Sequence, residues 1–343
     1  MLNQGSQTNA AATADNADVK ALLAEIETLG GRLARVRESI GKVIYGQHAV
    51  IDQTLITLLA GGHVLLIGVP GLAKTRLVET LGVVLGLDAK RVQFTPDLMP
   101  ADILGSEVLE ESDSGARSFR FIRGPVFCQL LMADEINRAS PRTQSALLQS
   151  MQEYQVSVAG IRHELPRPFH VLATQNPLEQ EGTYPLPEAQ LDRFLLQVDV
   201  DYPDLDAERT MMIATTGALQ PRADPVLNAE ELMRLQGLIR RVPVGEKVVD
   251  AILAMVRAGR PDGSSLEIVR RNVAWGPGPR ASQALMLAAR ARAVLDGRLA
   301  PSIDDVVALA GPVLRHRMAL TFAARADGVT INHVIDKLRE PLL

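Results

Sequence analysis

The chain has 343 residues, 47% of them hydrophobic, and its 36 Lys and Arg against 40 Asp and Glu give a net charge of −4. This length suffices for two domains with cores of their own, and the charge excludes a global basic field that would attract nucleic acid or anionic membranes. The single cysteine, Cys128, excludes an internal disulfide, and its apolar neighbours favour a core residue over a nucleophile.

The N-terminal residues 1–18 are rich in Asn, Ala, Thr and Gln and carry neither a basic nor an apolar segment. They are predicted to be a disordered tail and not a secretory signal. No apolar stretch reaches the length of about 18 residues that a membrane span needs. These features predict a cytoplasmic protein.

Apolar residues recur every three or four positions from Val19 to about Ile44, which predicts an amphipathic helix interrupted at Gly30 and Gly31. A second helical pattern follows and leads into an apolar strand. The turn between the two helices, around Ile44 and Gly46, is a candidate adenine pocket because it precedes that strand. A simple turn between helices explains the same residues equally well.

The apolar run from His63 to Ile67 stops at Gly68 and is followed by a glycine-containing loop that ends in Lys74 and Thr75. This pattern predicts a strand, a phosphate-binding loop and a helix start, in which loop amides and the helix dipole cradle phosphate. Lys74 would reach the β- and γ-oxygens, and the Thr75 hydroxyl would bind Mg²⁺. A buried strand followed by a plain glycine turn is the alternative. The candidate nucleotide-binding residues of this loop are Gly68, Pro70, Gly71, Leu72, Ala73, Lys74 and Thr75.

Ala73 stands where the strict phosphate-loop pattern has its last glycine. A methyl group is tolerated there if the residue has ordinary helical dihedrals, so we expect such dihedrals at Ala73. At Gly68 and Gly71 we expect either a positive φ or a close approach to phosphate.

A second apolar run, from Phe127 to Ala133, ends in Asp134 and Glu135. It predicts a parallel strand buried on both faces, whose carboxyl end lies beside the phosphate loop. Asp134 would then hold the Mg²⁺ shell, and Glu135 would orient and polarise the attacking water. An acidic pair could also cap a helix, but the phosphate loop upstream favours the catalytic interpretation.

Residues 169–174 predict a further strand, which places Asn176 at a carboxyl end too, where it could hold the water or the γ-phosphate. As an asparagine before proline, Asn176 could also be a turn residue, but its position after the strand favours the functional interpretation. Near-alternating segments around turn residues predict two hairpins, at about 105–125 and about 155–168. Beyond residue 204 the pattern is almost wholly helical, with helices expected at 204–222, 228–241, 246–258, 280–295 and 302–316.

Five motifs in order resemble those of the AAA+ ATPases, and specifically the MoxR family, across roughly residues 40–312. They are residues 68–75 as Walker A, 131–139 as Walker B, 173–177 as sensor 1, 186–194 with Arg193 as the arginine finger, and 276–281 with Arg280 as sensor 2. Alanine at position 73 is typical of that family. The resemblance implies an α/β fold: an AAA+ αβα nucleotide-binding core with a parallel sheet and two hairpin inserts, followed by a small all-α lid domain. We expect the core at residues 19–203 and the lid at residues 204–343.

The resemblance also implies ATP and Mg²⁺ as cofactors and a ring oligomer, in this family a hexamer. In such a ring Arg193 would reach the nucleotide of a neighbouring subunit, and Arg280 would act as a catalytic and nucleotide-binding residue; Arg280 could instead be a surface residue at a helix start. MoxR relatives are chaperone-like ATPases that mature client proteins or insert cofactors or metals into them, usually beside a partner with a von Willebrand factor A domain.

Two other functions share these motifs: a nucleic-acid motor and an ATPase subunit of a metal chelatase. The first hairpin has an acidic tip at residues 110–113, and the second offers only Arg162, His163 and Arg167, which disfavours nucleic acid as a partner. Val108, Phe119 and Phe121 give the first hairpin apolar character. They could engage a protein, or they could only hold the hairpin to the core.

Overall fold

The computed structural model describes residues 25, 28–111, 117–179, 181–217 and 221–343. The predicted tail of residues 1–18 and the turn of the first hairpin, residues 112–116, lie outside these ranges. Within the described ranges, no helix combines the length and the apolar character that crossing a membrane requires.

A five-stranded parallel sheet forms the centre of the molecule, in the order β2-β5-β8-β1-β9. Its strands are β1 (Val64–Ile67), β2 (Ala89–Gln93), β5 (Leu130–Asp134), β8 (His170–Gln175) and β9 (Leu196–Asp199). Since all five run the same way, their carboxyl ends meet at one edge of the sheet, where α/β proteins bind ligands. The parallel sheet predicted from the sequence is confirmed.

Alternate residues of each inner strand enter different hydrophobic clusters. In β5, Leu130 and Met132 belong to the cluster shared with α2, α3 and the C-terminal helices, whereas Leu131 and Ala133 belong to the cluster under α5. The sheet is therefore covered on both faces, as a continuous apolar run predicts. Cys128 is buried in the second cluster, and burial raises the pKa of its thiol to about 12, which confirms a core residue.

Helices and short turns complete the α/β part. They are α2 (His48–Leu59), α3 (Lys74–Val84), α4 (Pro100–Leu104), η1 (Ile136–Arg138), α5 (Pro141–Glu153) and α6 (Glu188–Leu191). Residues 28–41 are helical without a break, so the interruption predicted at Gly30 and Gly31 is wrong. Glycine in a helix costs about 1 kcal/mol relative to alanine, and burial of Leu33 and Val36 on the same helix offsets that cost.

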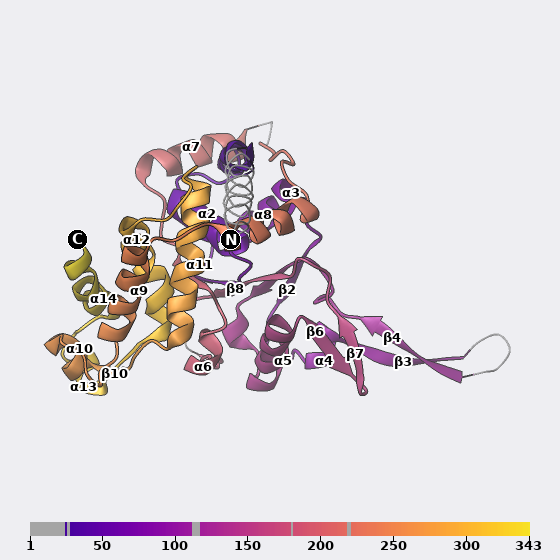
Figure 1. Ribbon diagram of the computed structural model, residues 1–343. Coiled ribbons are helices and arrows are strands. Elements are labelled where there is room, and N and C mark those ends of the chain that lie inside the picture. The colour runs from indigo at the N-terminus through magenta and orange to yellow at the C-terminus, as the bar shows by residue number, and fades with distance from the viewer. Residues whose placement is uncertain (1–24, 26–27, 112–116, 180, 218–220) are drawn as a thin grey trace, which may run out of the picture.

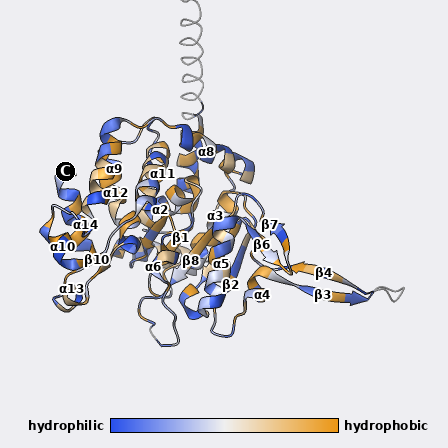
Figure 2. Cartoon of the chain, turned by 60° about the horizontal axis from the view of Figure 1, so that its bottom comes forward, coloured by the Kyte–Doolittle hydropathy of each residue, from blue (hydrophilic) through white to orange (hydrophobic). Residues whose placement is uncertain are grey.

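Both predicted hairpins are present, as β3 (Gly105–Glu111) with β4 (Arg117–Arg123) and as β6 (Gln155–Val158) with β7 (Ile161–Glu164). The β3–β4 hairpin projects from the body of the molecule (Figure 1), and hydrophobic residues continue along its projecting part (Figure 2). At its base the Phe121 ring stacks on His163 with centroids 4.0 Å apart, whereas Phe119 is 71% exposed. The base thus packs on the second hairpin, and the outer half presents apolar side chains to solvent.

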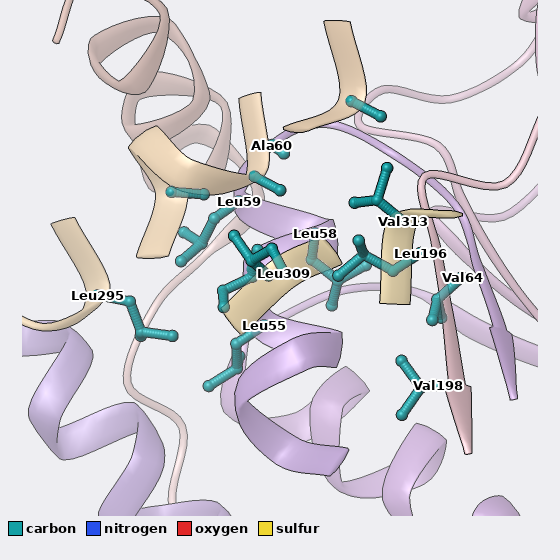
Figure 3. Packing of buried hydrophobic residues seen from close by; sticks show 14 of the residues in the cluster. Leu55, Leu58, Leu59, Ala60, Val64, Leu196, Val198, Leu295, Leu309 and Val313 are labelled. Atoms are coloured by element: carbon teal, nitrogen blue, oxygen red, sulfur yellow. The ribbon is translucent and has the colours of Figure 1, made fainter. Parts of the chain in front are cut away.

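The C-terminal part is helical, as predicted, and also contains a short antiparallel pair of strands, β10 (Val273–Trp275) and β11 (Ala319–Leu320). Its helices are α7 (Leu205–Thr216), α8 (Ala229–Arg241), α9 (Glu246–Ala258), α10 (Glu267–Asn272), α11 (Pro279–Leu295), α12 (Ile303–Leu314), η2 (Arg315–Arg317), α13 (Phe322–Ala326), α14 (Ile331–Arg339) and η3 (Glu340–Leu342). Leu309 and Val313 of α12 share one hydrophobic cluster with Leu58 of α2 and Leu196 of β9 (Figure 3). This shared core joins the helical part to the sheet.

Two buried histidines lie where the sheet meets α8. His170 Nδ1 donates to the Gly62 carbonyl at 2.8 Å, and its Nε2 lies 3.0 Å from Gln236 Nε2. His63 Nδ1 accepts from the Val171 amide at 3.0 Å, and its Nε2 lies 3.2 Å from the Met151 carbonyl. Burial lowers the pKa of His170 to about 4, and burial together with the nearby His170 lowers the pKa of His63 to about 3.

We expect the protein to lose stability as the pH falls from about 6.5 towards 4. In that window the unfolded chain protonates both histidines whereas the folded chain does not, so each one removes up to about 1.4 kcal/mol of unfolding free energy per pH unit. Denaturant unfolding at pH 7.5, 6 and 5 measures the slope. A His170→Asn variant should be less stable but show a flatter slope, while His333→Asn, at an exposed position, should keep the wild-type slope. Equal slopes in His170→Asn and wild type would contradict this expectation.

Candidate active site

The loop between β1 and α3 needs glycine at two positions, as a phosphate loop does, but its backbone conformation differs in part from the one expected from the sequence. Gly71 has φ +87° with open space around it, as expected. A Cβ on Gly68 would lie 2.5 Å from the Val200 carbonyl, so this glycine is needed for packing against the chain after β9. Ala73 has φ 55° and ψ 20°, so the helical dihedrals expected there are wrong. A left-handed alanine costs roughly 1–2 kcal/mol, which packing of the surrounding loop and helix must offset.

Lys74 and Thr75 open helix α3 at the end of this loop. The Lys74 ammonium donates to the Gly68 carbonyl, which holds its long side chain folded over the loop. Burial lowers the pKa of Lys74, and the charges of Asp134 and Glu135 oppose that effect. Since β1 and β5 both flank β8, the loop lysine and the two predicted carboxylates lie at the same edge of the sheet.

Asp134 is the last residue of β5 and is nearly buried. Its Oδ2 accepts from Arg91 Nη2 at 2.6 Å, and its Oδ1 accepts from the Thr174 hydroxyl at 2.6 Å. Since Arg91 lies on β2 and Thr174 on β8, the carboxylate is held from both neighbouring strands. Such bracing fixes the direction in which the side chain points.

Glu135 follows directly, with φ 54°, a left-handed conformation that is uncommon for a residue other than glycine. Its amide donates to the Thr174 hydroxyl at 2.8 Å. Its carboxylate accepts from Gln93 Nε2 at 2.8 Å and lies 3.4 Å from Arg138 Nη1. Backbone strain of this kind clusters at functional sites, and here it turns the glutamate away from the strand direction.

Asn176 comes directly after β8, next to the Gln175 carbonyl that accepts from the Gly68 amide. Its side-chain oxygen accepts from the Leu178 amide at 3.1 Å, the contact of a turn residue. Its Nδ2 lies 3.5 Å from Glu179. The side-chain oxygen therefore makes the contact of a turn residue, while the amide nitrogen faces Glu179.

A cavity of about 460 Å³ opens beside the phosphate loop, a size typical of small-ligand sites. Its lining comes from the turn before α2, the loop, the segment after β9 and helix α7. The lining residues are Val43, Ile44, Tyr45, Gln47, Pro70, Gly71, Leu72, Ala73, Arg76, Tyr202, Pro203, Glu208, Met211, Thr215 and Pro221. Ile44, a residue of the candidate adenine pocket, thus lies in the wall of this cavity. Gly46 lies behind it, where a Cβ would be 2.3 Å from the Ala207 side chain.

Arg193 and Arg280 lie together in a different cavity, of about 260 Å³, to which the phosphate loop contributes no residue. Arg280 Nη1 is 3.6 Å from Asp192, whose carboxylate also pairs with the buried Arg317 at 2.7 Å. Burial and the charge of Arg280 lower the pKa of Arg193. Within the described ranges the Arg193 guanidinium forms no ion pair. The structure therefore brings these two arginines to each other and not to the phosphate loop of their own chain.

The oxygen donors beside the loop suit a magnesium ion. The described residues contain no group of three or more His, Cys, Asp or Glu side chains that could hold a metal by themselves. Mg²⁺ at nucleotide sites typically uses one or two carboxylates together with phosphate oxygens and water. The Thr75 hydroxyl and the Asp134 carboxylate fit that chemistry.

Sequence reasoning missed the residues that hold the two carboxylates, namely Arg91, Gln93, Thr174 and Arg138. A signal was present for two of them, because residues 91–95 have the pattern of a short strand, in which Arg91 and Gln93 alternate with Val92 and so lie on one face. The contribution of α7 to the cavity beside the phosphate loop had no such signal, since it depends on how the chain folds back after β9.

The sequence matches the model of the ATPase family associated with various cellular activities (AAA) at residues 63–196 and that of the AAA lid domain at residues 266–338. It is 42% identical to Chaperone MoxR1 of Mycobacterium tuberculosis, over 97% of this chain and 87% of that protein. Protein MoxR of Paracoccus denitrificans is 32% identical over 84% of this chain and 89% of its own length. A crystal structure of a protein from Cytophaga hutchinsonii, named as an ATPase, superposes with a TM-score of 0.86 at 35% identity, covering 95% of this chain and 98% of the other.

The phosphate loop, the braced carboxylate pair and the helical lid occur in the order of the AAA architecture, and the similarity to MoxR proteins covers most of the chain. This protein therefore belongs to the MoxR family of AAA ATPases.

Proposed function

We propose that this protein hydrolyses ATP at the edge of the sheet where β1, β5 and β8 end. The observation that carries the proposal is that Lys74, Asp134 and Glu135 lie at one edge of the parallel sheet, beside a cavity of about 460 Å³. A passive nucleotide binder has no need of a braced glutamate next to the phosphates.

In this proposal Lys74 and the loop amides bind the phosphates, and Thr75 with Asp134 would hold Mg²⁺. The ion, when bound, neutralises charge that develops on the transferring phosphoryl group. Glu135 orients the attacking water and accepts its proton, and Asn176 Nδ2 holds the water or the γ-phosphate from the neighbouring strand. Ile44 and Met211 offer apolar contacts to the adenine ring.

The position of the two arginines supports a ring in which they serve a neighbouring subunit. Arg193 and Arg280 share a cavity to which their own phosphate loop contributes no residue, and in this proposal a second copy presents its nucleotide to them. A guanidinium that crosses an interface in this way makes hydrolysis depend on assembly. The hexamer is the form we propose, on the basis of the family.

The work done with ATP is proposed to be remodelling or maturation of client proteins, including insertion of cofactors or metals. The name of the chaperone MoxR1, at 42% identity, supports a chaperone-like role. A partner with a von Willebrand factor A domain is part of the same proposal and rests on the family resemblance.

The hairpins favour protein over nucleic acid as the substrate. All three described arginines of the first hairpin are engaged: Arg120 pairs with Glu110 at 2.9 Å, Arg117 pairs with Glu111 at 3.1 Å, and Arg123 lies over the Phe127 ring. In the second hairpin His163 stacks on Phe121. Few cations are left to neutralise several phosphates at once.

We therefore expect single-stranded and duplex DNA and RNA to leave the ATPase rate unchanged within about twofold at 100–150 mM salt, since each phosphate contact contributes close to one unit of salt slope and few are available here. The measurement is phosphate release with and without each nucleic acid. Marked stimulation, together with binding whose log affinity falls steeply with log salt, would favour a nucleic-acid motor instead.

The ATPase proposal itself is tested on the full chain. Purified protein with ATP and Mg²⁺ should release phosphate at a rate per subunit that rises with protein concentration as rings assemble. A chain that binds ATP but shows no turnover at any concentration would contradict the proposal.

A further inference from the structure

Asp134, the carboxylate that would hold the metal ion, already forms an ion pair with Arg91. Arg91 donates to the same oxygen, Oδ2, through both Nε at 3.1 Å and Nη2 at 2.6 Å. The other oxygen accepts from the buried Thr174 hydroxyl at 2.6 Å. Each oxygen of the carboxylate is therefore engaged, and one of them is engaged by a full positive charge.

The same arginine is linked to the second carboxylate. Arg91 Nη2 donates to Gln93 Oε1 at 2.9 Å, and Gln93 Nε2 donates to Glu135 Oε2 at 2.8 Å. Two neighbouring side chains on β2 thus contact Asp134, the last residue of β5, and Glu135, which follows it.

The two partners in the Arg91–Asp134 pair differ in exposure. The Arg91 side chain is 51% exposed, whereas that of Asp134 is 12% exposed and is tied to β8 through Thr174. The arginine can therefore yield towards solvent, while the carboxylate stays in place.

We propose that Arg91 is a positioning residue that sets the magnesium requirement of the site. Its guanidinium and a hydrated Mg²⁺ compete for the same carboxylate, so the arginine weakens metal binding at Asp134. Metal loading then needs a higher Mg²⁺ concentration than an unpaired aspartate would need. This inference rests on the proposed role of Asp134 in holding the metal.

Removing the charge should make the metal bind more tightly. In Arg91→Gln we expect the free Mg²⁺ concentration at half-saturation to fall about tenfold, because one unit of positive charge a few ångströms from a divalent ion is lost in a partly solvated site. Arg91→Lys keeps the charge, so its half-saturation point should stay within about twofold of wild type.

The experiment follows the binding of a fluorescent ADP analogue to the full chain while free Mg²⁺ is titrated, so the readout does not depend on hydrolysis. Lys90→Gln is the matched control. It removes the same charge from the same strand, but Lys90 points to the Phe127 carbonyl at 3.0 Å and not to the site. We expect Lys90→Gln to reach half-saturation at the same free Mg²⁺ concentration as wild type.

Asp134→Asn separates this inference from the proposed function. A wild-type Mg²⁺ response in Asp134→Asn would show that the metal assignment is wrong. If Asp134→Asn loses the response while Arg91→Gln has an unchanged or higher half-saturation point, the role of Arg91 alone is overturned. Should Arg91→Gln fail to fold, a tenfold shift in Arg91→Lys, where the charge persists, would overturn the inference as well.

Discussion

Replacing Glu135 with glutamine should abolish ATP turnover while leaving ATP binding nearly intact. The substitution removes the negative charge that accepts the proton of the attacking water, and general-base catalysis is worth roughly 10²–10⁴ in rate. Glutamine has the same size, and its side-chain oxygen can still accept from Gln93, as the glutamate does at 2.8 Å. The measurements are phosphate release and equilibrium affinity for ATP on the same preparations.

Lys74→Ala serves as the contrasting variant, because it should weaken ATP binding itself. A charge-assisted contact to phosphate contributes about 1.5–3 kcal/mol, which corresponds to roughly a tenfold to hundredfold loss of affinity. The exposed Glu246→Gln on α9 is a control for loss of an acidic charge and should hydrolyse ATP normally. An active Glu135→Gln protein would exclude Glu135 as the base.

Arg193→Ala should lose hydrolysis by on the order of 10³ or more and keep its affinity for ATP. Arg193 lies in a cavity with Arg280, and this cavity shares no residue with the one beside the phosphate loop of the same chain. Its loss therefore leaves its own phosphate loop untouched and removes charge stabilisation from a neighbouring site. Turnover and nucleotide affinity are measured at concentrations where rings are assembled.

Mixing variants tests whether the arginine acts across an interface. In rings that combine Arg193→Ala with Lys74→Ala, some interfaces pair an intact phosphate loop with an intact Arg193, so activity should recover. Rings that combine Lys74→Ala with Glu135→Gln contain no complete site and should stay inactive, which makes them the matched control. Absence of recovery in rings shown to be mixed would argue for a role within one chain.

The residue pattern alone was enough to predict the parallel sheet, the two hairpins, the helical C-terminal part and the edge of the sheet that carries the site. The physical reason is local. A strand buried on both faces must be apolar throughout, as residues 130–133 are, and its polar residues can appear only where it ends, as Asp134 does. A phosphate loop also needs a backbone that few sequences allow, which is why Gly71 was a reliable sign.

The backbone conformation of single residues was harder to predict from the sequence, because the surrounding packing can impose a conformation that the residue itself disfavours. Ala73 and Glu135 are both left-handed although neither is glycine, and residues 30 and 31 are helical although both are glycine. Gly68 was expected to have a positive φ or to approach phosphate closely, and the structure gives it a further constraint, because a side chain there would meet the Val200 carbonyl.

Only the tertiary structure decided which residues hold the two carboxylates and where the arginines lie. Arg91 is 43 positions from Asp134, and the register of β2 against β5 brings them together. Arg193 and Arg280 are far apart in sequence but share one cavity, because α11 packs its start against the segment that follows α6. Contacts of this kind depend on how distant elements dock through a common core, and no local pattern of apolar and polar residues encodes that docking.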